Sequence, residues 1–394
     1  MSTKRFVYIF LDFFVNKCYN SCVEENMNPY IPEKLPIKNI DLTRLANKLE
    51  DASSNVYRYD GMLNNFVNPD ILLSPLIRKE GDMSSRIEGT QSTMSDVLKF
   101  ESGQKFEEKQ EREIIGIRNY RYALKFGEQY ISEGRKISLS LLKELHQSLM
   151  KGAKWDSRSI PGNFREEQVF IAPQGQTIEN ASYIPPEHLL VKEYLENWQE
   201  YLSEENINKL IQAAVMHAQF EIIHPFVDGN GRIGRMLIPL YLFQVGVLQK
   251  PVLYISEYFE QNRDEYYRRL RNITLNNEWT EWIEFFLTAI AVQAKNNIVK
   301  AKKISVLYEE MKAKFQKLIN SRYNIAALDT LFKNPIINVN RFSEKSNIKI
   351  YTTARSIIKK LEKSNLIIKL QEGKGRTSAF YAFPALLNII DENL

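Results

Sequence analysis

The sequence predicts a mainly α-helical protein that contains more than one domain. Its 394 residues are enough for two or three separately buried cores. Apolar residues make up 44% of the chain and charged residues 26%, which is the balance of a globular protein. From about residue 40 to about residue 300, apolar residues recur at spacings of three and four, the period of a helix with one buried face. One internal stretch and the C-terminal end depart from that period.

The first 30 residues (1–30) are expected to form a tail. The run FVYIFLDFFV (6–15) resembles a secretory signal, but Asp12 interrupts it and the run is too short to span a bilayer. The tail holds the two cysteines of the chain, Cys18 and Cys22, so a disulfide scaffold is excluded and a reducing compartment is the default. We therefore expect a cytoplasmic protein without a membrane segment, whose first residues are disordered or precede the true start.

Two helical regions follow the tail. Residues 31–110 are predicted to form an N-terminal helical segment, and residues 111–295 a larger helical core. In the segment INKLIQAAVMHAQF (207–220), the apolar residues form one stripe, which indicates a buried face rather than a binding site. The same period occurs in LTRLANKLEDA (42–52), YRYALKFGEQYI (120–131), SLSLLKELHQSLM (138–150) and HLLVKEYLENWQEYL (188–202).

The stretch at 163–189 breaks the helical pattern. It begins with the β-favouring residues Val169, Phe170 and Ile171, continues with turn residues, and ends at Pro185 and Pro186. We expect a short β-hairpin or an extended flap between two helices.

The composition changes after about residue 300. Residues 296–320 read as a charged amphipathic connecting helix, and residues 321–394 as three helices followed by two strands. That order resembles a winged helix-turn-helix. The segment 321–394 has 12 Lys and Arg against 6 acidic residues, so its net charge is +6 while the whole chain carries +5. Such a module binds DNA or mediates protein contacts and dimerisation.

The segment HPFVDGNGRIGR (224–235) concentrates polar and flexible residues. Pro225 prevents the preceding helix from continuing, and turn residues lead into a new helix at about Arg232. A glycine-rich turn that opens a helix presents unpaired backbone N–H groups and the positive end of the helix dipole. Arg232 and Arg235 are three residues apart, so both can face one anion. The segment therefore predicts a phosphate site.

Two further residues of this segment supply chemistry. Asp228 is suited to Mg²⁺, which takes one or two carboxylates together with phosphate oxygens. His224 has an ordinary pKa near neutrality and is the natural general base. The segment can therefore position a nucleotide phosphate and deprotonate an incoming hydroxyl group.

Every fixed position of the segment matches the signature of the Fic family, H-P-F-x-[D/E]-G-N-[G/K]-R-x-x-R. The resemblance implies a helical-bundle core with a small β-hairpin flap. It also implies a nucleotidyltransferase, a protein adenylyltransferase that moves AMP from ATP onto a Ser, Thr or Tyr hydroxyl of a protein and releases pyrophosphate. Phosphocholine and UMP donors are the alternatives within the family, and ATP is favoured by family frequency.

The resemblance assigns a role to each residue of the segment. His224 would be the base, Asp228 would hold Mg²⁺, and Phe226 would pack inward as an anchor. The loop backbone with Asn230 would bind the α- and β-phosphates, and the two arginines would bind the outer phosphates. The ATP-binding residues of the loop would thus be Gly229, Asn230, Gly231, Arg232, Ile233, Gly234 and Arg235.

The flap and a later helix extend the resemblance. The edge strand of the family's flap aligns a target segment by β-augmentation, and Val169, Phe170, Ile171 and Ala172 would lie near the nucleotide. In SEYFEQNRDEYYRRL (256–270), Tyr266 or Tyr267 would contact the adenine. The alternatives are structural: a surface hairpin for the first and ordinary helix packing for the second.

An inhibitory motif lies upstream in MSSRIEGTQSTM (83–94). Ser84, Glu88 and Gly89 match the family pattern [S/T]-x-x-x-E-[G/N], and the resemblance pairs Glu88 with Arg235. A carboxylate that occupies an arginine fork removes it from the γ-phosphate, so ATP would bind in a non-productive pose. The letters alone also fit a helix N-cap followed by a glycine stop.

These observations lead to one main expectation and two alternatives. The main expectation is an adenylyltransferase that modifies proteins, including itself, and that Glu88 restrains. The first alternative is an enzyme of the same fold that mainly removes AMP, with Glu88 positioning a water. The second is a DNA-binding regulator with TTARSIIKKLEK (352–363) as recognition helix and Lys374 and Arg376 on the wing. A second copy of the chain is a further candidate partner.

Overall fold

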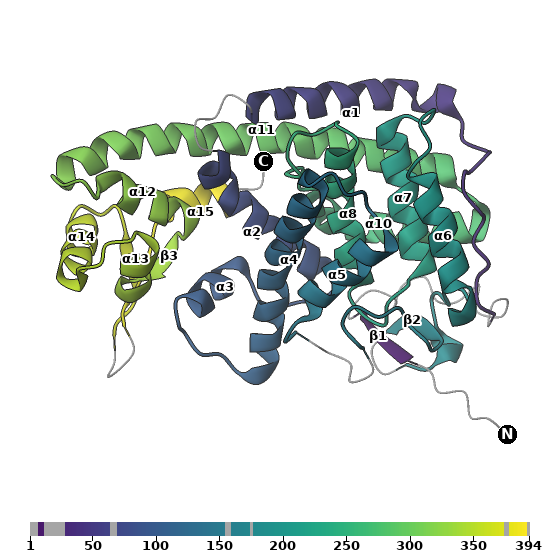
Figure 1. The fold of residues 1–394 in the computed structure, drawn as a ribbon, viewed down its shortest axis with the longest axis horizontal. Coiled ribbons are helices and arrows are strands. Elements are labelled where there is room, and N and C mark those ends of the chain that lie inside the picture. The colour runs from purple at the N-terminus through teal and green to yellow at the C-terminus, as the bar shows by residue number, and fades with distance from the viewer. Residues whose placement is uncertain are drawn as a thin grey trace.

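The computed structural model describes residues 7–11, 28–63, 69–153, 159–173, 176–373 and 378–391. Helices dominate this part of the chain, so the prediction of a mainly helical protein is confirmed (Figure 1). None of its helices combines the length and the apolar character needed to cross a bilayer. Four residues with predicted properties lie outside the described ranges: Cys18, Cys22, Lys374 and Arg376.

One long helix joins the two halves of the molecule. Helix α11 (Trp279–Leu318) has 40 residues, and α1 (Leu42–Leu63) packs along it (Figure 1). The predicted connector at 296–320 is the second half of α11 rather than a separate element. The helix continues because its apolar stripe continues: Ile304, Leu307 and Met311 are buried like the residues of its first half.

Helices α7 (Lys209–Ile223) and α8 (Asn230–Gln244) form the centre of the core and are buried on nearly all sides. The indole N–H groups of Trp282 and Trp198 donate to the α7 carbonyls of Ala214 and Met216, each at 2.9 Å. The loop between α7 and α8 is therefore held at both ends by a rigid core. The other core helices are α4 (Glu108–Ser132), α5 (Leu139–Met150), α6 (Val191–Tyr201), α9 (Ser256–Gln261) and α10 (Arg263–Asn276), with short 3₁₀ turns η1 (Ile178–Asn180) and η2 (His188–Leu190).

The N-terminal segment supplies α2 (Pro69–Ile87) and α3 (Met94–Glu101). Thr93 caps α3, and its side chain and that of Asp96 form a reciprocal capping box. Helix α2 packs on α4, α8 and α9, and a Cβ added at Gly81 would come within 3.0 Å of the Ile117 carbonyl oxygen. This close approach lets α2 lie deep against the core and carries the inhibitory motif to the α7–α8 loop.

The flap contains less strand than predicted and pairs with the N-terminal tail. Strand β2 (Val169–Pro173) forms one antiparallel bridge, between Ile171 and Tyr183. Its other edge pairs in parallel with β1 (Val7–Leu11), in the register Val7↔Val169 to Leu11↔Pro173. Residues 1–30 were predicted to form a tail that is disordered or precedes the true start, whereas the structure describes a strand within it. The β-branched and aromatic residues of VYIFL favour this extended pairing.

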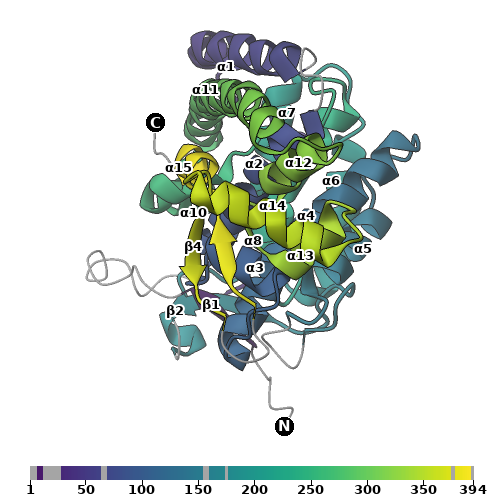
Figure 2. The same ribbon diagram turned by 90° about the vertical axis from the view of Figure 1, so that its left-hand side faces the viewer.

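The C-terminal domain lies beneath the second half of α11 (Figure 1) and faces the viewer in Figure 2. It contains a three-stranded antiparallel sheet in the order β3-β5-β4. Strand β3 and helix α15 were not predicted. The domain packs on α2: the Lys79 ammonium lies 2.9 Å from the Asp391 carboxylate, and Arg78 donates to Asn334 Oδ1 at 3.3 Å. Its elements are α12 (Asn324–Lys333), β3 (Ile336–Asn338), α13 (Val339–Lys345), α14 (Tyr351–Lys363), β4 (Ile368–Gln371), β5 (Phe380–Ala382) and α15 (Pro384–Asp391).

The close approach at Gly81 predicts a large effect of substitution. Gly81→Val should lower the free energy of unfolding by about 1–3 kcal/mol, because a branched side chain meets a backbone carbonyl that cannot rotate away. Gly61 is the matched control, since it lies exposed in α1 with open space around its Cβ position. Gly61→Ala should raise the same free energy by about 0.4–1 kcal/mol. Urea unfolding measures both, and a higher midpoint for Gly81→Val would contradict the packing described.

Candidate active site

The loop between α7 and α8 has a left-handed residue at each end. Helix α7 ends at Ile223, and His224 closes it with φ 51°, a conformation that costs a non-glycine residue about 1–2 kcal/mol. Gly229 has φ 82° and precedes α8, which begins at Asn230 rather than at about Arg232 as predicted. The loop therefore turns sharply within six residues, and its conformation needs support from outside.

Arg165 supplies part of that support from the segment before the flap. Its side chain is buried, and its Nε donates to the His224 carbonyl at 2.8 Å. Its backbone N–H donates to the Pro225 carbonyl at 2.8 Å, and its Nη2 donates to the Pro186 carbonyl at 2.5 Å. One guanidinium thus ties the start of the loop to both ends of the flap.

The side chain of Asn230 organises the loop from within. Its Oδ1 accepts from the Phe226 N–H and its Nδ2 donates to the Phe226 carbonyl, each at 2.8 Å. Asn230 was predicted to take part in phosphate binding, and in the structure its amide oxygen and one of its amide N–H groups are already used inside the loop. Its second amide N–H and its backbone N–H remain for a ligand.

The start of α8 forms the predicted anion site. The first helical hydrogen bond runs from the Ile233 N–H to the Gly229 carbonyl at 3.0 Å. The N–H groups of Asn230, Gly231 and Arg232 precede that bond, so they stand at the positive end of the helix dipole. An anion such as a phosphate is stabilised at this position.

His224 is arranged to accept a proton. Burial and the neighbouring Arg165 charge lower its pKa to about 4, so the ring is neutral at physiological pH. Its Nδ1 lies 3.3 Å from the Glu221 carbonyl oxygen, which can only accept a hydrogen bond. Nδ1 therefore carries the proton, and Nε2 is the basic nitrogen.

Asp228 fits the predicted metal ligand. Its Oδ1 accepts from Arg232 Nη2 at 3.1 Å, while its Oδ2 is buried and has no hydrogen-bond partner among the described residues. A buried, unpaired carboxylate oxygen beside an anion site suits a hard cation. The described ranges contain no cluster of three or more His, Cys, Asp and Glu side chains. Mg²⁺ bound here would thus depend on one carboxylate and on phosphate oxygens.

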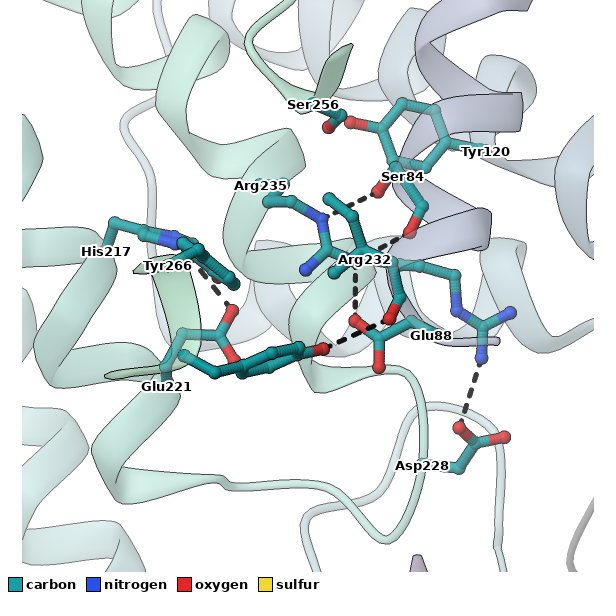
Figure 3. A network of polar contacts seen from close by, with 12 residues as sticks. Ser84, Glu88, Tyr120, His217, Glu221, Asp228, Arg232, Arg235, Ser256 and Tyr266 are labelled. Atoms are coloured by element: carbon teal, nitrogen blue, oxygen red, sulfur yellow. Dashed lines mark hydrogen bonds and ion pairs between the residues drawn. The ribbon is translucent and has the colours of Figure 1, made fainter. Parts of the chain in front are cut away.

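The inhibitory motif occupies Arg235 (Figure 3). Arg235 Nη2 lies 2.6 Å from Glu88 Oε1 and donates to the Ser84 carbonyl at 2.8 Å, and its Nε donates to Ser84 Oγ at 3.0 Å. Arg232 instead points to Asp228 (Figure 3). The sequence analysis expected both arginines to be able to face one anion, but in this state they have different partners. Glu88 therefore takes the place of a ligand on Arg235.

The charges around Arg235 explain why it stays bound to Glu88. Burial alone would raise the pKa of Glu88, but the Arg235 charge outweighs it and lowers that pKa. A second carboxyl group, that of Glu221, is buried nearby, and burial raises its pKa to about 8 although Arg235 opposes the shift. Glu221 is thus mainly protonated at neutral pH and leaves Glu88 as the anionic partner.

The structure separates the two tyrosines proposed for the adenine. Tyr266 is buried, its hydroxyl lies 3.0 Å from His217 Nε2, and its ring stacks on Phe259 at 4.5 Å. Tyr267 is half-buried and donates to the Ile87 carbonyl at 3.2 Å, one residue from Glu88. Tyr267 is therefore the residue of the pair that can face a nucleotide, and Tyr266 supports it from the core.

The predicted flap residues differ in exposure. Val169, Phe170 and Ala172 are buried, and Phe170 and Ala172 form a small cluster with Ile184. The Ile171 backbone already bonds within the flap, since its N–H donates to the Tyr183 carbonyl at 2.8 Å. Hydrophobic packing therefore fixes the strand itself.

Sequence reasoning missed several residues that hold the site. Arg165 and Glu221 are described above. Glu80 on α2 accepts from the Ser256 N–H at 3.1 Å and from its hydroxyl at 2.5 Å, and so fastens the inhibitory helix to α9. His146 on α5 contacts the loop through Phe226 and Asp228. Each of them is a polar residue within or beside an apolar helical or strand pattern. That break in the pattern is the signal in the sequence that could have pointed to them.

Comparison with known families matches this geometry. The family model described as Fic/DOC family covers residues 136–242, which include the flap, α7 and the catalytic loop. The model described as Fic/DOC family N-terminal covers residues 46–129, which include α2 and the inhibitory motif.

Known proteins with similar sequences match part of the chain. A probable protein adenylyltransferase of Aquifex aeolicus is 27% identical over 143 residues, 36% of this chain and 38% of the relative. The protein adenylyltransferase fic-1 of Caenorhabditis elegans is 28% identical over 148 residues, 37% of this chain and 26% of the relative. The chain thus matches well under half the length of these relatives.

A solved structure shows the same fold over most of the chain. A Fic family protein from Desulfovibrio desulfuricans is similar with a TM-score of 0.55 and 19% identity, and the match covers 88% of this chain and 98% of that one. The two family models, the relatives and this likeness agree on one assignment. The chain therefore contains a domain that matches the Fic/DOC family and, before it, a domain that matches the Fic/DOC family N-terminal region.

Proposed function

We propose that the protein is an adenylyltransferase that transfers AMP from ATP to a hydroxyl group of a protein, and that it is held in an inhibited state by Glu88. The observation that carries the proposal is the juxtaposition of a neutral buried histidine with the anion site at the start of α8. The adenylyltransferase relatives support the same chemistry.

In this mechanism the residues of the loop have distinct tasks. The N–H groups at the start of α8 hold the phosphates. Asp228 would hold Mg²⁺, which would neutralise phosphate charge. His224 Nε2 takes the proton of the target hydroxyl as its oxygen attacks the α-phosphorus. The bond from the α-phosphorus to the bridging oxygen breaks, and pyrophosphate leaves with its electron pair. The target protein and AMP are then joined by a phosphodiester bond.

The inhibited state follows from the contact at Arg235. A γ-phosphate needs the same guanidinium that Glu88 and Ser84 now occupy. ATP that binds beside this contact lacks the arginine on its outer phosphate, so its α-phosphorus is not held in line for attack. Release of Glu88 is the step that activates the enzyme.

The first prediction of this mechanism concerns the contact between Glu88 and Arg235. Glu88→Gly should raise self-labelling from α-labelled ATP by about 10- to 100-fold, since a hydrogen bond to a charged group contributes about 1.5–3 kcal/mol. Glu88→Gln, which keeps the shape and loses the charge, should give an intermediate increase. Autoradiography of the purified full chain measures both. Equal labelling of the wild type and Glu88→Gly would refute the inhibitory role.

The second prediction concerns the base. In the Glu88→Gly background, His224→Ala should reduce labelling by about 10²- to 10⁴-fold, the usual contribution of general base catalysis. His188, which is half-buried in η2, is the matched control, and His188→Ala should leave labelling unchanged. Mass spectrometry that detects an AMP adduct in both histidine variants at equal yield would contradict the assignment.

The third prediction concerns pH. A base acts in its unprotonated form, and an ordinary histidine with a pKa of about 6.5 would lose about tenfold of its active form at pH 5.5. His224 has a pKa of about 4, so it stays unprotonated there. The initial rate of Glu88→Gly labelling should therefore stay level from pH 7.5 to 5.5. A tenfold fall over that interval, with the protein still folded by circular dichroism, would show that the pKa of the base is that of an ordinary histidine and would contradict the lowered pKa of His224.

We also propose that the C-terminal domain is a winged helix-turn-helix that contacts DNA. Helix α14 buries Ala354, Ile357, Ile358 and Leu361, and on its opposite side it exposes Arg355, Lys359 and Lys363 at four-residue spacing. A row of exposed cations on such a helix suits the phosphates of a duplex.

This second proposal predicts salt-dependent binding. The full chain should retard a DNA duplex in a gel at low salt. In the double variant Arg355→Ala/Lys359→Ala, the steepness of log affinity against log salt should fall by about 2 units, since each lost phosphate contact removes about 1. Lys192→Ala is the control, since this exposed lysine lies on α6 outside the domain. No retardation at low salt would leave protein contacts as the role of the domain.

A further inference from the structure

We propose that His146 is a positioning residue of the transfer reaction, which fixes the backbone that carries the metal-binding carboxylate of Asp228. The inference rests on the proposed adenylyl transfer for its place in the reaction. Its structural basis is one ring on α5 that contacts two other segments, the one before the flap and the catalytic loop.

The contacts of the ring are specific. Its Nε2 lies 3.0 Å from the Asp228 carbonyl oxygen, and its Nδ1 lies 2.9 Å from the Gly162 backbone nitrogen. Its face stacks on Phe226, with ring centroids 3.9 Å apart and planes inclined by 8°. Phe226 in turn packs against Phe164 at 5.2 Å. The ring is 1% exposed, so solvent does not compete for these contacts.

The geometry determines the tautomer. The Gly162 N–H can only donate, so Nδ1 of His146 is an acceptor and carries no proton. The Asp228 carbonyl can only accept, so Nε2 is the protonated nitrogen and donates to it. A neutral ring with one donor and one acceptor satisfies both backbone groups.

Gly162 is built for this contact. It has φ 90°, in the left-handed region that favours glycine, and a Cβ there would lie 3.3 Å from the Lys143 carbonyl oxygen. Glycine thus lets the backbone before the flap approach α5 and turn its N–H toward the ring. His146 therefore couples the flap segment to the loop.

The contact matters for Asp228 because the residue is held by its backbone on one side and by Arg232 on the other. Its Oδ1 accepts from Arg232, and its Oδ2 is left unpaired. A carbonyl fixed by His146 sets the direction from which that Oδ2 approaches a cation. Partners that orient a metal ligand in this way typically change metal affinity or activity by about 10- to 100-fold when they are removed.

The test separates the two nitrogens of the ring. The amide nitrogen of glutamine takes nearly the place of Nε2, so His146→Gln keeps the bond to the Asp228 carbonyl. The amide oxygen of asparagine takes nearly the place of Nδ1, so His146→Asn keeps only the bond from Gly162. Both variants are made in the full chain with Glu88→Gly. Two quantities are measured: label transfer from α-labelled ATP, and the Mg²⁺ concentration that gives half of the ATP-induced rise in melting temperature.

We expect His146→Asn to lose label transfer by about 10- to 100-fold and to need about tenfold more Mg²⁺, while His146→Gln stays within about threefold of its parent. Equal behaviour of the two variants, or a loss in His146→Asn with an unchanged Mg²⁺ midpoint, would overturn the proposal. If His146→Asn does not fold, the test rests on His146→Gln. An altered Mg²⁺ midpoint in this folded variant would then be enough to overturn the proposal. A parent that shows the Mg²⁺-dependent shift without label transfer would refute the adenylyl transfer and leave the His146 inference standing.

Discussion

The contact on which the site depends is the ion pair between Arg235 and Glu88. It joins two segments 147 residues apart in the chain, and the arginine is only 1% exposed. A buried guanidinium without a partner is unfavourable by several kcal/mol, so α2 must lie against α8 as long as Arg235 lacks another anion. Gly81 permits the close packing that this demands, and Glu80 fastens the same helix to the start of α9. The position of α2 is thus set by the buried charge of Arg235, the close packing at Gly81 and the hydrogen bonds of Glu80.

The catalytic loop depends on supporting residues as well as on its reactive groups. His224 has a left-handed backbone that needs support, and Arg165 provides it by binding the His224 carbonyl. Burial lowers the pKa of the His224 ring, and the charge of the same guanidinium lowers it further. The ring is therefore neutral. One contact therefore gives the base both its orientation and its protonation state. Asn230 closes the other end of the loop with two bonds to Phe226.

The local parts of this site could be predicted from the sequence. The turn after α7 and a helix beyond it follow from a short motif, although the helix begins at Asn230, two residues before the predicted start. The pairing of Glu88 with Arg235 follows from the resemblance of two short motifs to the Fic patterns. Arg165 and His146 were missed, since a polar residue in an apolar pattern does not reveal which distant segment it contacts. The continuous α11 was missed because a change in surface charge near residue 300 does not interrupt a buried stripe. Strand β1 was missed because its pairing needs β2, which lies more than 150 residues away.

The buried pair also explains how release of Glu88 can occur at all. Removing the carboxylate from Arg235 would leave an uncompensated buried charge, so opening of α2 in the absence of ligand is unfavourable. A γ-phosphate at Arg235 replaces one anion by another and removes most of that penalty. Glu221 does not compete for this role, because burial raises its pKa to about 8 and leaves it mainly protonated at neutral pH. In the proposed mechanism the exchange at Arg235 is therefore between Glu88 and the nucleotide, and the proposed inhibited and active states differ in which of these two anions the arginine holds.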